Sequence, residues 1–443
     1  MSTGELFEGL PVPARPEPPP GETPEVRVLR PNRQQLQLRP SDLESLLPEE
    51  HTARLVWAYV DRQDLSALYA PIKAVAGGSG RSAIAPEILL SLWLYATLEG
   101  VGSARALARL CEAHDAYRWL CGGVRVNHHT LSDFRVGHAT FLDGLLTTSV
   151  ASLLACKAVT MVRVAQDGMR VRAHAGTGSF RRRARLEQCL QEARQQVAAL
   201  KKELQDDPDA SNRRQQAARE RAVRERGKRL EAALAALPQA EKIKRTQGKS
   251  EASARTSTTD AEATVMKMAD GGFRPAYNVQ FASDTSSQVI AGVDVVSIGS
   301  DLGQLVPMMD QLEVRYGKRP AELLVDGGFA KREAIEQVAQ RTTVYAPVVK
   351  PKDADRDPHA ALPTDSEVIA EWRARMGTAA AQTIYKERAA TAECVNAQAR
   401  NRGLQRFNVR GLNKVKSVVL LYALAHNLMR TVALSPGLLG MTA

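Results

Sequence analysis

Met161-Val-Arg-Val-Ala-Gln-Asp-Gly168 is the stretch that decides the fold, because a β-branched run ends there in an acidic residue. A second run, Leu323-Leu-Val-Asp-Gly-Gly-Phe329, repeats the pattern and places Asp326 after another predicted strand. An aspartate before glycine at a strand end is most often a turn or cap residue, so neither motif is specific alone. Asp167 and Asp326 are candidate metal ligands only if the fold brings their two strands together.

The elements predicted around these strands form a sheet with helices. Residues 276–282 alternate in polarity, turn at 284–287 and resume as 288–296, which predicts a β-hairpin. The later predictions are a helix over 304–316, a strand over 322–325, a helix over 331–341, a strand over 343–349, a polar loop over 350–368, and helices over 391–401 and 412–434. Three antiparallel strands followed by alternating helix and strand are typical of a ribonuclease-H-like α/β core. In that topology the first and fourth strands are neighbours, and a late helix can bring Glu393 to the same point.

A basic helical insertion is expected to interrupt this core after its first strand. Apolar residues recur at steps of four and three, which is a heptad seam formed by Leu186, Leu190, Ala193, Val197, Leu200 and Leu204. A turn over 206–211 and a returning helix predict an antiparallel helical hairpin. Residues 181–250 hold 19 Lys and Arg but 10 Asp and Glu. The bias in sign favours contact with DNA over a merely solvated charged face.

Composition constrains the partners and the compartment. The net charge is +11 with a pI near 9.5, which indicates a polyanionic partner such as nucleic acid. Five dispersed cysteines without a C-x-x-C pair indicate a reducing cytosol. No signal peptide is legible in the first ten residues, and no uninterrupted run of about 18 apolar residues predicts a membrane span. We therefore expect a cytoplasmic protein that is not associated with a membrane.

The N-terminal part is predicted to be helical after a disordered lead. Residues 11–24 are rich in Pro and Glu. Short helices then follow, with Pro86 suited to a first helical turn and Ser103 to an N-cap. Two interpretations stay open for these helices: a helix-turn-helix-like DNA reader, or an all-helical packing or dimerisation domain.

Several motifs, in their order along the chain, carry a family resemblance. They are 87–100 with 103–111, 166–168, 259–263, 271–280, 326–329 and 385–400. This ordered set resembles a bacterial insertion-sequence transposase of the D-D-E class, in the branch with a helical N-terminal domain, an insertion after the first catalytic strand and a tyrosine-arginine-glutamate-lysine signature. The resemblance covers roughly residues 45–435.

The resemblance implies a catalytic site and a set of DNA-binding residues. Asp167, Asp326 and Glu393 would be catalytic and would hold two Mg²⁺ ions, with Mn²⁺ as an alternative. Tyr385, Arg388 and Arg400 would accompany Glu393 near bound DNA. Asn396 of the same helix is also predicted to bind DNA, and Lys414 and Lys416 are added because their positive charge would neutralise phosphates. This sequence departs from the signature twice: four residues separate Arg388 from Glu393 where three are usual, and Arg400 stands where the signature has lysine. Arginine still binds phosphate, with planar geometry. Because of the extra residue, Glu387 stays open as a less favoured substitute for Glu393.

The expected enzyme is a DNA transposase that cleaves insertion-sequence ends and joins them to target DNA. Its partners would be the terminal inverted repeats, the target DNA and further copies of the chain, with a dimer expected on paired ends. The alternatives are a non-catalytic DNA-binding or regulatory protein derived from a transposase, and a metal-dependent nuclease without strand transfer. The expected division is 1–40 disordered lead, 41–156 helical DNA-binding or oligomerisation domain, 157–180 first core strand, 181–250 hairpin insertion and 251–443 remainder of the catalytic domain.

Overall fold

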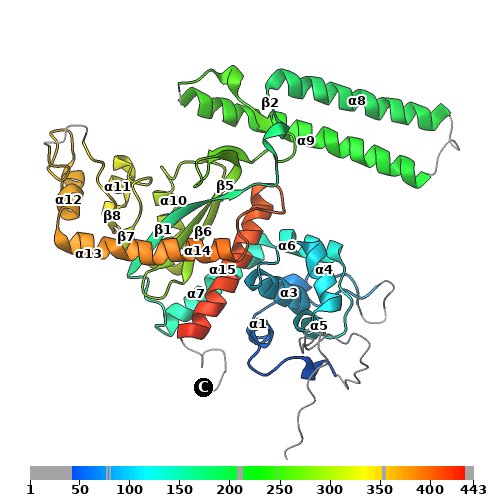
Figure 1. The fold of residues 1–443 in the computed structure, drawn as a ribbon, viewed down its shortest axis with the longest axis horizontal. Coiled ribbons are helices and arrows are strands. Elements are labelled where there is room, and N and C mark those ends of the chain that lie inside the picture. Colours follow the sequence, from blue (N-terminus) through cyan, green and yellow to red (C-terminus); the bar gives the residue numbers. More distant parts are fainter. Residues whose placement is uncertain are drawn as a thin grey trace, which may run out of the picture. The chain divides into compact units, whose positions relative to one another are not determined.

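A computed structural model describes residues 42–75, 78, 81–206, 213–246, 248–351 and 356–434. The described residues from Leu43 onward belong to one compact unit. The lead predicted for residues 1–40 lies outside the described residues, as does most of the turn predicted for 206–211. The fold is mixed α/β, as the sequence predicted (Figure 1).

Only helices occur in the described residues between 44 and 155. They are η1 Glu44–Leu46, α1 Thr52–Asp61, α2 Ser66–Tyr69, α3 Pro86–Leu98, α4 Ala104–Ala113, α5 Asp115–Cys121, α6 His128–Gly137 and α7 Ala139–Ala155. Local chemistry explains where several of these helices begin. Pro86 occupies the first turn of α3, the Ser103 hydroxyl accepts the Ala106 N–H at 3.3 Å, and the Asn127 side chain accepts two N–H groups at the start of α6.

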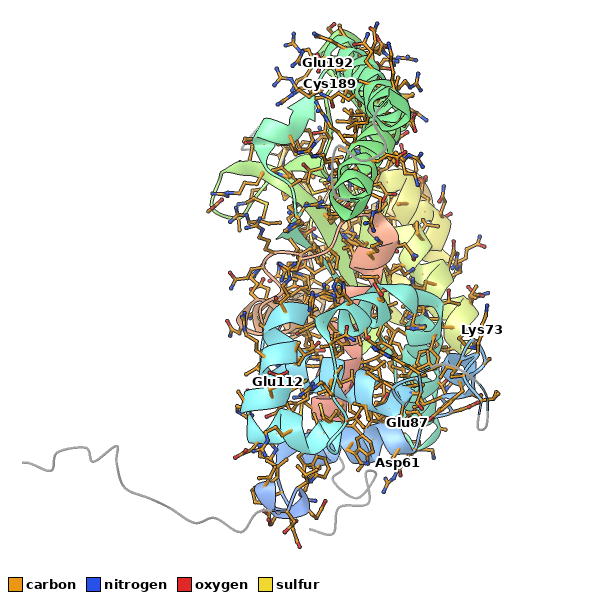
Figure 2. All side chains as sticks on the ribbon, turned by 90° about the vertical axis from the view of Figure 1, so that its right-hand side faces the viewer. Asp61, Lys73, Glu87, Glu112, Cys189 and Glu192 are labelled. Carbon is orange, nitrogen blue, oxygen red and sulfur yellow. The ribbon has the colours of Figure 1, made fainter. Side chains whose placement is uncertain are left out.

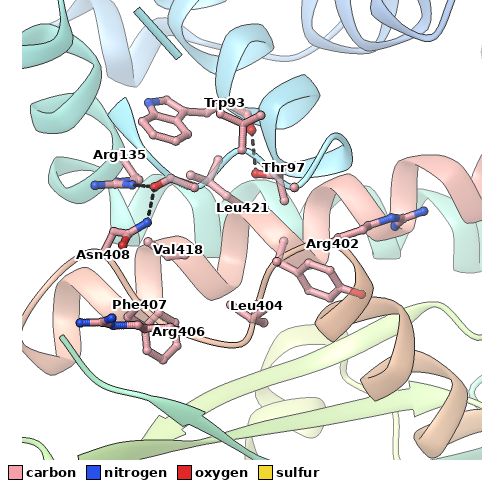
Figure 3. A pocket seen from close by; sticks show the side chains of 15 residues that line it. Trp93, Thr97, Arg135, Arg402, Leu404, Arg406, Phe407, Asn408, Val418 and Leu421 are labelled. Atoms are coloured by element: carbon pink, nitrogen blue, oxygen red, sulfur yellow. Dashed lines mark hydrogen bonds between the residues drawn. The ribbon is translucent and has the colours of Figure 1, made fainter. Parts of the chain in front are cut away.

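Helix α3 is buried on nearly every side because α1 and the last helix, α15 (Leu412–Leu434), pack against it. A small hollow of about 60 Å³ lies where α3, α6 and α15 meet the loop that precedes α15. Figure 3 shows Arg135 and Asn408 at this junction, both donating to the Gly102 carbonyl. The Arg135 guanidinium also stacks on Trp93 at 4.7 Å from the ring centroid, and burial lowers the pKa of this guanidinium to about 10. The junction therefore ties the N-terminal helices to the C-terminal ones.

The main sheet has the order β4-β5-β1-β7-β8, with β6 also paired to β5. Its strands are β1 Arg163–Arg172, β4 Thr264–Lys267, β5 Phe273–Asp284, β6 Ile290–Val296, β7 Glu322–Leu324 and β8 Thr343–Tyr345. β5 is antiparallel to β1 and to β6, which confirms the predicted hairpin over 276–296. β7 is parallel to β1 and is hydrogen-bonded to it, as the predicted strand order required. The short strand β4 was not predicted.

Strand β1 is longer than its apolar run indicates. The sequence predicted a strand that ends at Asp167, but β1 continues to Arg172 and pairs with β5 from Val164 to Arg172. The pattern of apolar residues misses this half because Gly168 and Arg170 lie on a face of the strand that is covered by polar side chains. Asp167 therefore lies within a strand and not in a turn.

Helices α8 (Arg183–Asp206) and α9 (Arg213–Thr246) pack side by side as a hairpin (Figure 1). They share a small core of their own, formed by Leu186, Leu190, Ala193, Leu230 and Ala233. This core matches the first half of the predicted heptad seam. Charged side chains surround the hairpin, and Figure 2 labels Cys189 and Glu192 on α8. At its base, β2 (Phe180–Arg181) pairs with β3 (Thr256–Ser257).

Helices cover the sheet and close the chain. They are α10 Leu305–Tyr316, α11 Arg332–Ala339, α12 Glu367–Met376, α13 Ala379–Arg388, a π-helical turn Ala389–Glu393, and α14 Cys394–Asn401, followed by α15. The Asn427 side chain docks α15 on β6, because its amide oxygen accepts the Ile290 N–H and its amide nitrogen donates to the Ile290 carbonyl, both at 2.8 Å.

Helix α15 is long and apolar enough to cross a membrane by length and composition, which the sequence analysis did not expect. However, 61% of its apolar window is buried inside the protein. Its contacts with α3, α6, α7 and β6 account for that burial, so α15 packs as a core helix does.

Candidate active site

Asp167 lies where β1 loses one of its neighbours. β7 pairs with β1 only from Arg163 to Ala165, so the edge of β1 is open to the loop after β7 at the level of Asp167. Burial raises the pKa of the Asp167 carboxyl to about 6, and the nearby Asp326 and Asp301 carboxylates add to the rise. The Arg388 guanidinium and the Gly168 N–H oppose it. Asp167 is thus a mostly buried carboxyl among other acidic groups.

Asp326 reaches the same region from the loop that follows β7. Its Oδ1 accepts the Gly328 N–H at 2.7 Å, which fixes the carboxylate beside the chain. A Cβ on Gly328 would stand 2.9 Å from Asp326 Oδ1 and 3.6 Å from Asp301 Oδ2. Two carboxylates therefore converge on one point in front of Gly328. The pairing of β1 with β7 brings Asp167 and Asp326 together although 158 residues separate them in the sequence.

Glu393 is linked to Asp167 by the guanidinium of Arg388, which pairs with both. The Arg388 guanidinium lies 3.1 Å from Glu393 Oε1 and 3.7 Å from Asp167 Oδ2, so one cation bridges the two acidic groups. The Glu393 side chain is 60% exposed. Glu387 is engaged elsewhere, in an ion pair with Arg163. Of the two glutamates, only Glu393 shares a partner with Asp167.

The irregular spacing between Arg388 and Glu393 has a structural counterpart. Residues Ala389–Glu393 form a π-helical turn between α13 and α14. A π turn accommodates one additional residue within a helix without changing the direction of its flanks. Arg388, which precedes this turn, and Glu393, which ends it, are 3.1 Å apart, and Arg388 lies 3.7 Å from Asp167.

Asn396 contacts the acidic cluster directly. It lies nearly one helical turn after Glu393, and its Nδ2 donates to Asp167 Oδ2 at 2.9 Å. Its Oδ1 is buried and has no hydrogen-bond partner in the described part of the chain. The sequence placed Asn396 among the DNA-binding residues, whereas in the structure its amide binds a carboxylate.

The other predicted DNA-binding residues are distributed around this point. The Tyr385 ring lies 5.8 Å from the Arg388 guanidinium carbon. Arg400 is exposed at the end of α14, and Lys414 is exposed near the start of α15. Lys416 pairs with Asp294 on β6 at 3.7 Å. Of the predicted DNA-binding residues, Tyr385 and Arg388 therefore lie beside the carboxylates together with Asn396. Arg400, Lys414 and Lys416 form no ion pair with these carboxylates in the described part of the chain.

Asp301 is the acidic residue that sequence reasoning missed. It lies between β6 and α10 and is 5% exposed. Its Oδ1 accepts the Asn278 and Gln280 amides at 2.7 and 2.8 Å, and its Oδ2 pairs with Arg170 at 2.9 Å. The signal was present in the polar pair Asn278 and Gln280, at alternate positions between the apolar residues of β5. A buried strand carries two amides on one face when they bind a buried polar group.

The donor set suits a hard divalent cation, because Asp167, Asp326 and Glu393 offer carboxylate oxygens. The guanidinium between Asp167 and Glu393 shows that a cation is electrostatically favoured there. Within the described ranges, however, no three His, Cys, Asp or Glu side chains are arranged so that they could hold one ion together.

Family models match two parts of the chain. The model described as Transposase domain (DUF772) matches residues 41–137, and the model described as Transposase DDE domain matches residues 354–432. Both matches are to transposase domains, so they support an insertion-sequence transposase of the DDE class. Neither a curated protein nor a solved structure matches it. The second match includes Arg388, Glu393 and Asn396 of the transposase, whereas Asp167 and Asp326 lie between the two matches. The assignment of Asp167 and Asp326 to the candidate active site therefore depends on their positions in the structure and not on the family matches.

Proposed function

We propose that this transposase cleaves the ends of an insertion sequence and joins them to target DNA by metal-dependent phosphoryl transfer. One observation carries the proposal: the parallel pairing of β1 and β7 brings Asp167 and Asp326 to one edge of the sheet, and Arg388 links Asp167 to Glu393. The strand order supports a ribonuclease-H-like core with a helical hairpin inserted after β1. The helices over 41–156 would then form the N-terminal DNA-binding or oligomerisation domain, packed against the C-terminal helices.

Asp167, Asp326 and Glu393 would hold two Mg²⁺ ions, or Mn²⁺. When bound, a pair of divalent ions activates the attacking water or 3′-hydroxyl and stabilises the leaving oxygen of the phosphodiester. The residues of the chain prepare this site. Asn396 orients the Asp167 carboxylate through its 2.9 Å hydrogen bond. Asp326 is held by the Gly328 N–H, which leaves its second oxygen free of that bond.

Arg388 would change partners during the reaction. Its guanidinium bridges Asp167 and Glu393 in the structure, and a planar guanidinium also suits a phosphate. Release of Glu393 would leave Arg388 available to neutralise the DNA backbone beside the cleaved bond. Tyr385 would keep the guanidinium in place through its ring.

The wider functional assignment follows from the same proposal. Arg400, Lys414 and Lys416 would bind phosphates of the terminal inverted repeats or of the target DNA. Synapsis of two ends would need a homo-oligomer, with a dimer as the simplest arrangement. A transposase of this kind would act in the bacterial cytoplasm, at the nucleoid.

A strand-transfer assay tests the proposal. The purified transposase is incubated with Mg²⁺, a plasmid that carries the reading frame with its flanking DNA, and a target plasmid. We expect joined products from the wild-type protein and from Asp61→Asn, an exposed aspartate of α1, and none from Asp167→Asn or Asp326→Asn.

Full activity of Asp326→Asn would overturn the assigned site. DNA binding without cleavage by the wild-type protein would favour the regulatory alternative. Nicked DNA that is never joined would favour a nuclease.

A further inference from the structure

An open groove of about 800 Å³ begins at Gly168, the residue next to Asp167. It passes along the second half of β1, the tip of the β4–β5 hairpin, and the end of α14 with the segment that follows it. Of the residues that line this groove, Arg400 alone belongs to the DNA-binding set predicted from the sequence. The other lining residues are far apart in the sequence, so only the fold brings them together.

The groove is strongly cationic. Five basic residues and one acidic residue line it: Arg170, Arg172, Lys267, Arg274 and Arg400 against Asp270. Two of the cations are neutralised, because Arg170 pairs with Asp301 and Arg274 pairs with Asp270. The other three, Arg172, Lys267 and Arg400, form no ion pair with another described residue, and all three are exposed.

The hairpin tip adds an exposed aromatic ring beside one of these cations, Lys267. Phe273 is 65% exposed and stands directly opposite Lys267 in the β4–β5 ladder. Cross-strand partners share one face of the sheet, so Phe273 and Lys267 face the same side. Exposure of the Phe273 ring to water costs free energy, but the ring beside Lys267 offers a surface on which a nucleic-acid base can stack.

We propose that this groove holds the DNA strand that flanks the cleaved phosphodiester. Arg172, Lys267 and Arg400 contact successive phosphates as the strand leaves the carboxylates, and Phe273 stacks on a base. The inference rests on the proposed function, since it takes the Asp167 end of the groove as the site of cleavage. The groove fits a nucleic acid better than a small anion because its free cations are spread over three separate elements of the fold.

A salt titration of DNA binding tests the groove without any catalytic step. The full-length protein is titrated, without divalent metal, against a short fluorescein-labelled duplex of arbitrary sequence and its single strand. Each neutralised phosphate contributes about 0.9 to the slope of log affinity against log salt for a duplex. We expect Arg172→Ala combined with Lys267→Ala to reduce that slope by roughly two. The matched control, Lys318→Ala with Lys350→Ala, removes two exposed lysines that do not line the groove and should leave the slope unchanged.

Two local readouts accompany the titration. Lys267 should be protected from acetylation when DNA is bound, whereas Lys318 should not. Phe273→Ala should weaken binding of the single strand several-fold or more, and binding of the duplex by less. An unchanged slope in the double variant, or equal acetylation of Lys267 with and without DNA, would refute the proposal that the groove binds DNA.

The proposed function and the groove can fail separately. If the wild-type protein joins DNA ends and the groove variants do so equally well, the groove assignment is wrong and the function stands. If DNA protects Lys267 but no cleavage occurs under any condition, the groove stands and the catalytic assignment is wrong.

Discussion

Replacement of Gly168 by alanine should damage the protein although the backbone at this position accepts any residue. Gly168 lies inside β1, and a Cβ there would stand 2.1 Å from Asp301 Oδ1, 2.5 Å from Gln280 Nε2 and 2.9 Å from Asn278 Oδ1. All three neighbours are buried. None can swing into solvent, as a surface lysine could.

The cost can be worked from these contacts. Overpacking of a close-packed site typically costs about 1–3 kcal/mol. Displacement of Asp301 also weakens the hydrogen bonds from Asn278 and Gln280, and bonds to a charged group contribute about 1.5–3 kcal/mol each. We therefore expect Gly168→Ala to lower the free energy of unfolding by about 2–5 kcal/mol. The shift of Asp301 should also reduce DNA cleavage by the folded fraction.

Urea unfolding followed by circular dichroism measures the effect. Gly144→Ala is the matched control, because Gly144 lies in the exposed part of α7 with no atom within 4 Å of its would-be Cβ. That change should stabilise the protein by about 0.5–1 kcal/mol. In an Asp301→Ala background the penalty of Gly168→Ala should shrink, since its closest contact is gone. An equal penalty in both backgrounds, or no penalty in the wild type, would refute the steric argument.

Two further predictions concern the C-terminal helices. Burial lowers the pKa of His426 to about 4 from 6.5, so the unfolded chain gains a proton at a higher pH than the folded protein. Stability should fall by roughly 3 kcal/mol as the pH drops from about 6.5 to about 4. His426→Gln, which can still donate to the Gln288 carbonyl, should reduce this loss in urea unfolding, and an identical pH dependence would contradict it. Deletion of Ala389 should convert the π turn to a regular helix and preserve DNA cleavage. Insertion of one alanine at the same place should rotate Glu393 by about 100° about the helix axis and abolish cleavage. Equal loss of cleavage in both variants would disprove the proposed helical register of Glu393.

Much of the fold could be predicted from local patterns. The helical caps at Ser103 and Asn127, the β5–β6 hairpin and the first half of the α8–α9 seam follow from residue type and period, which depend on near neighbours in the chain. The second half of β1 and strand β4 could not be read in this way. Strand β4 is short, and the second half of β1 follows the Asp167-Gly168 pair, a residue pair typical of turns. Both segments are extended because β5 pairs with them.

For the candidate site, too, local features could be predicted from the sequence, whereas long-range contacts could not. The sequence alone determined which acidic residues end apolar runs and which helical segment carries Tyr385, Arg388 and Glu393, because those features are local. Only the tertiary structure decided that Asp301 lies beside Gly168, that Asn396 binds Asp167, and that Arg388 lies between two acidic groups. The same holds for the groove, whose free cations come from three separate elements. These are contacts between segments far apart in the chain, and their electrostatic consequences depend on distance and burial, which no spacing in the sequence encodes.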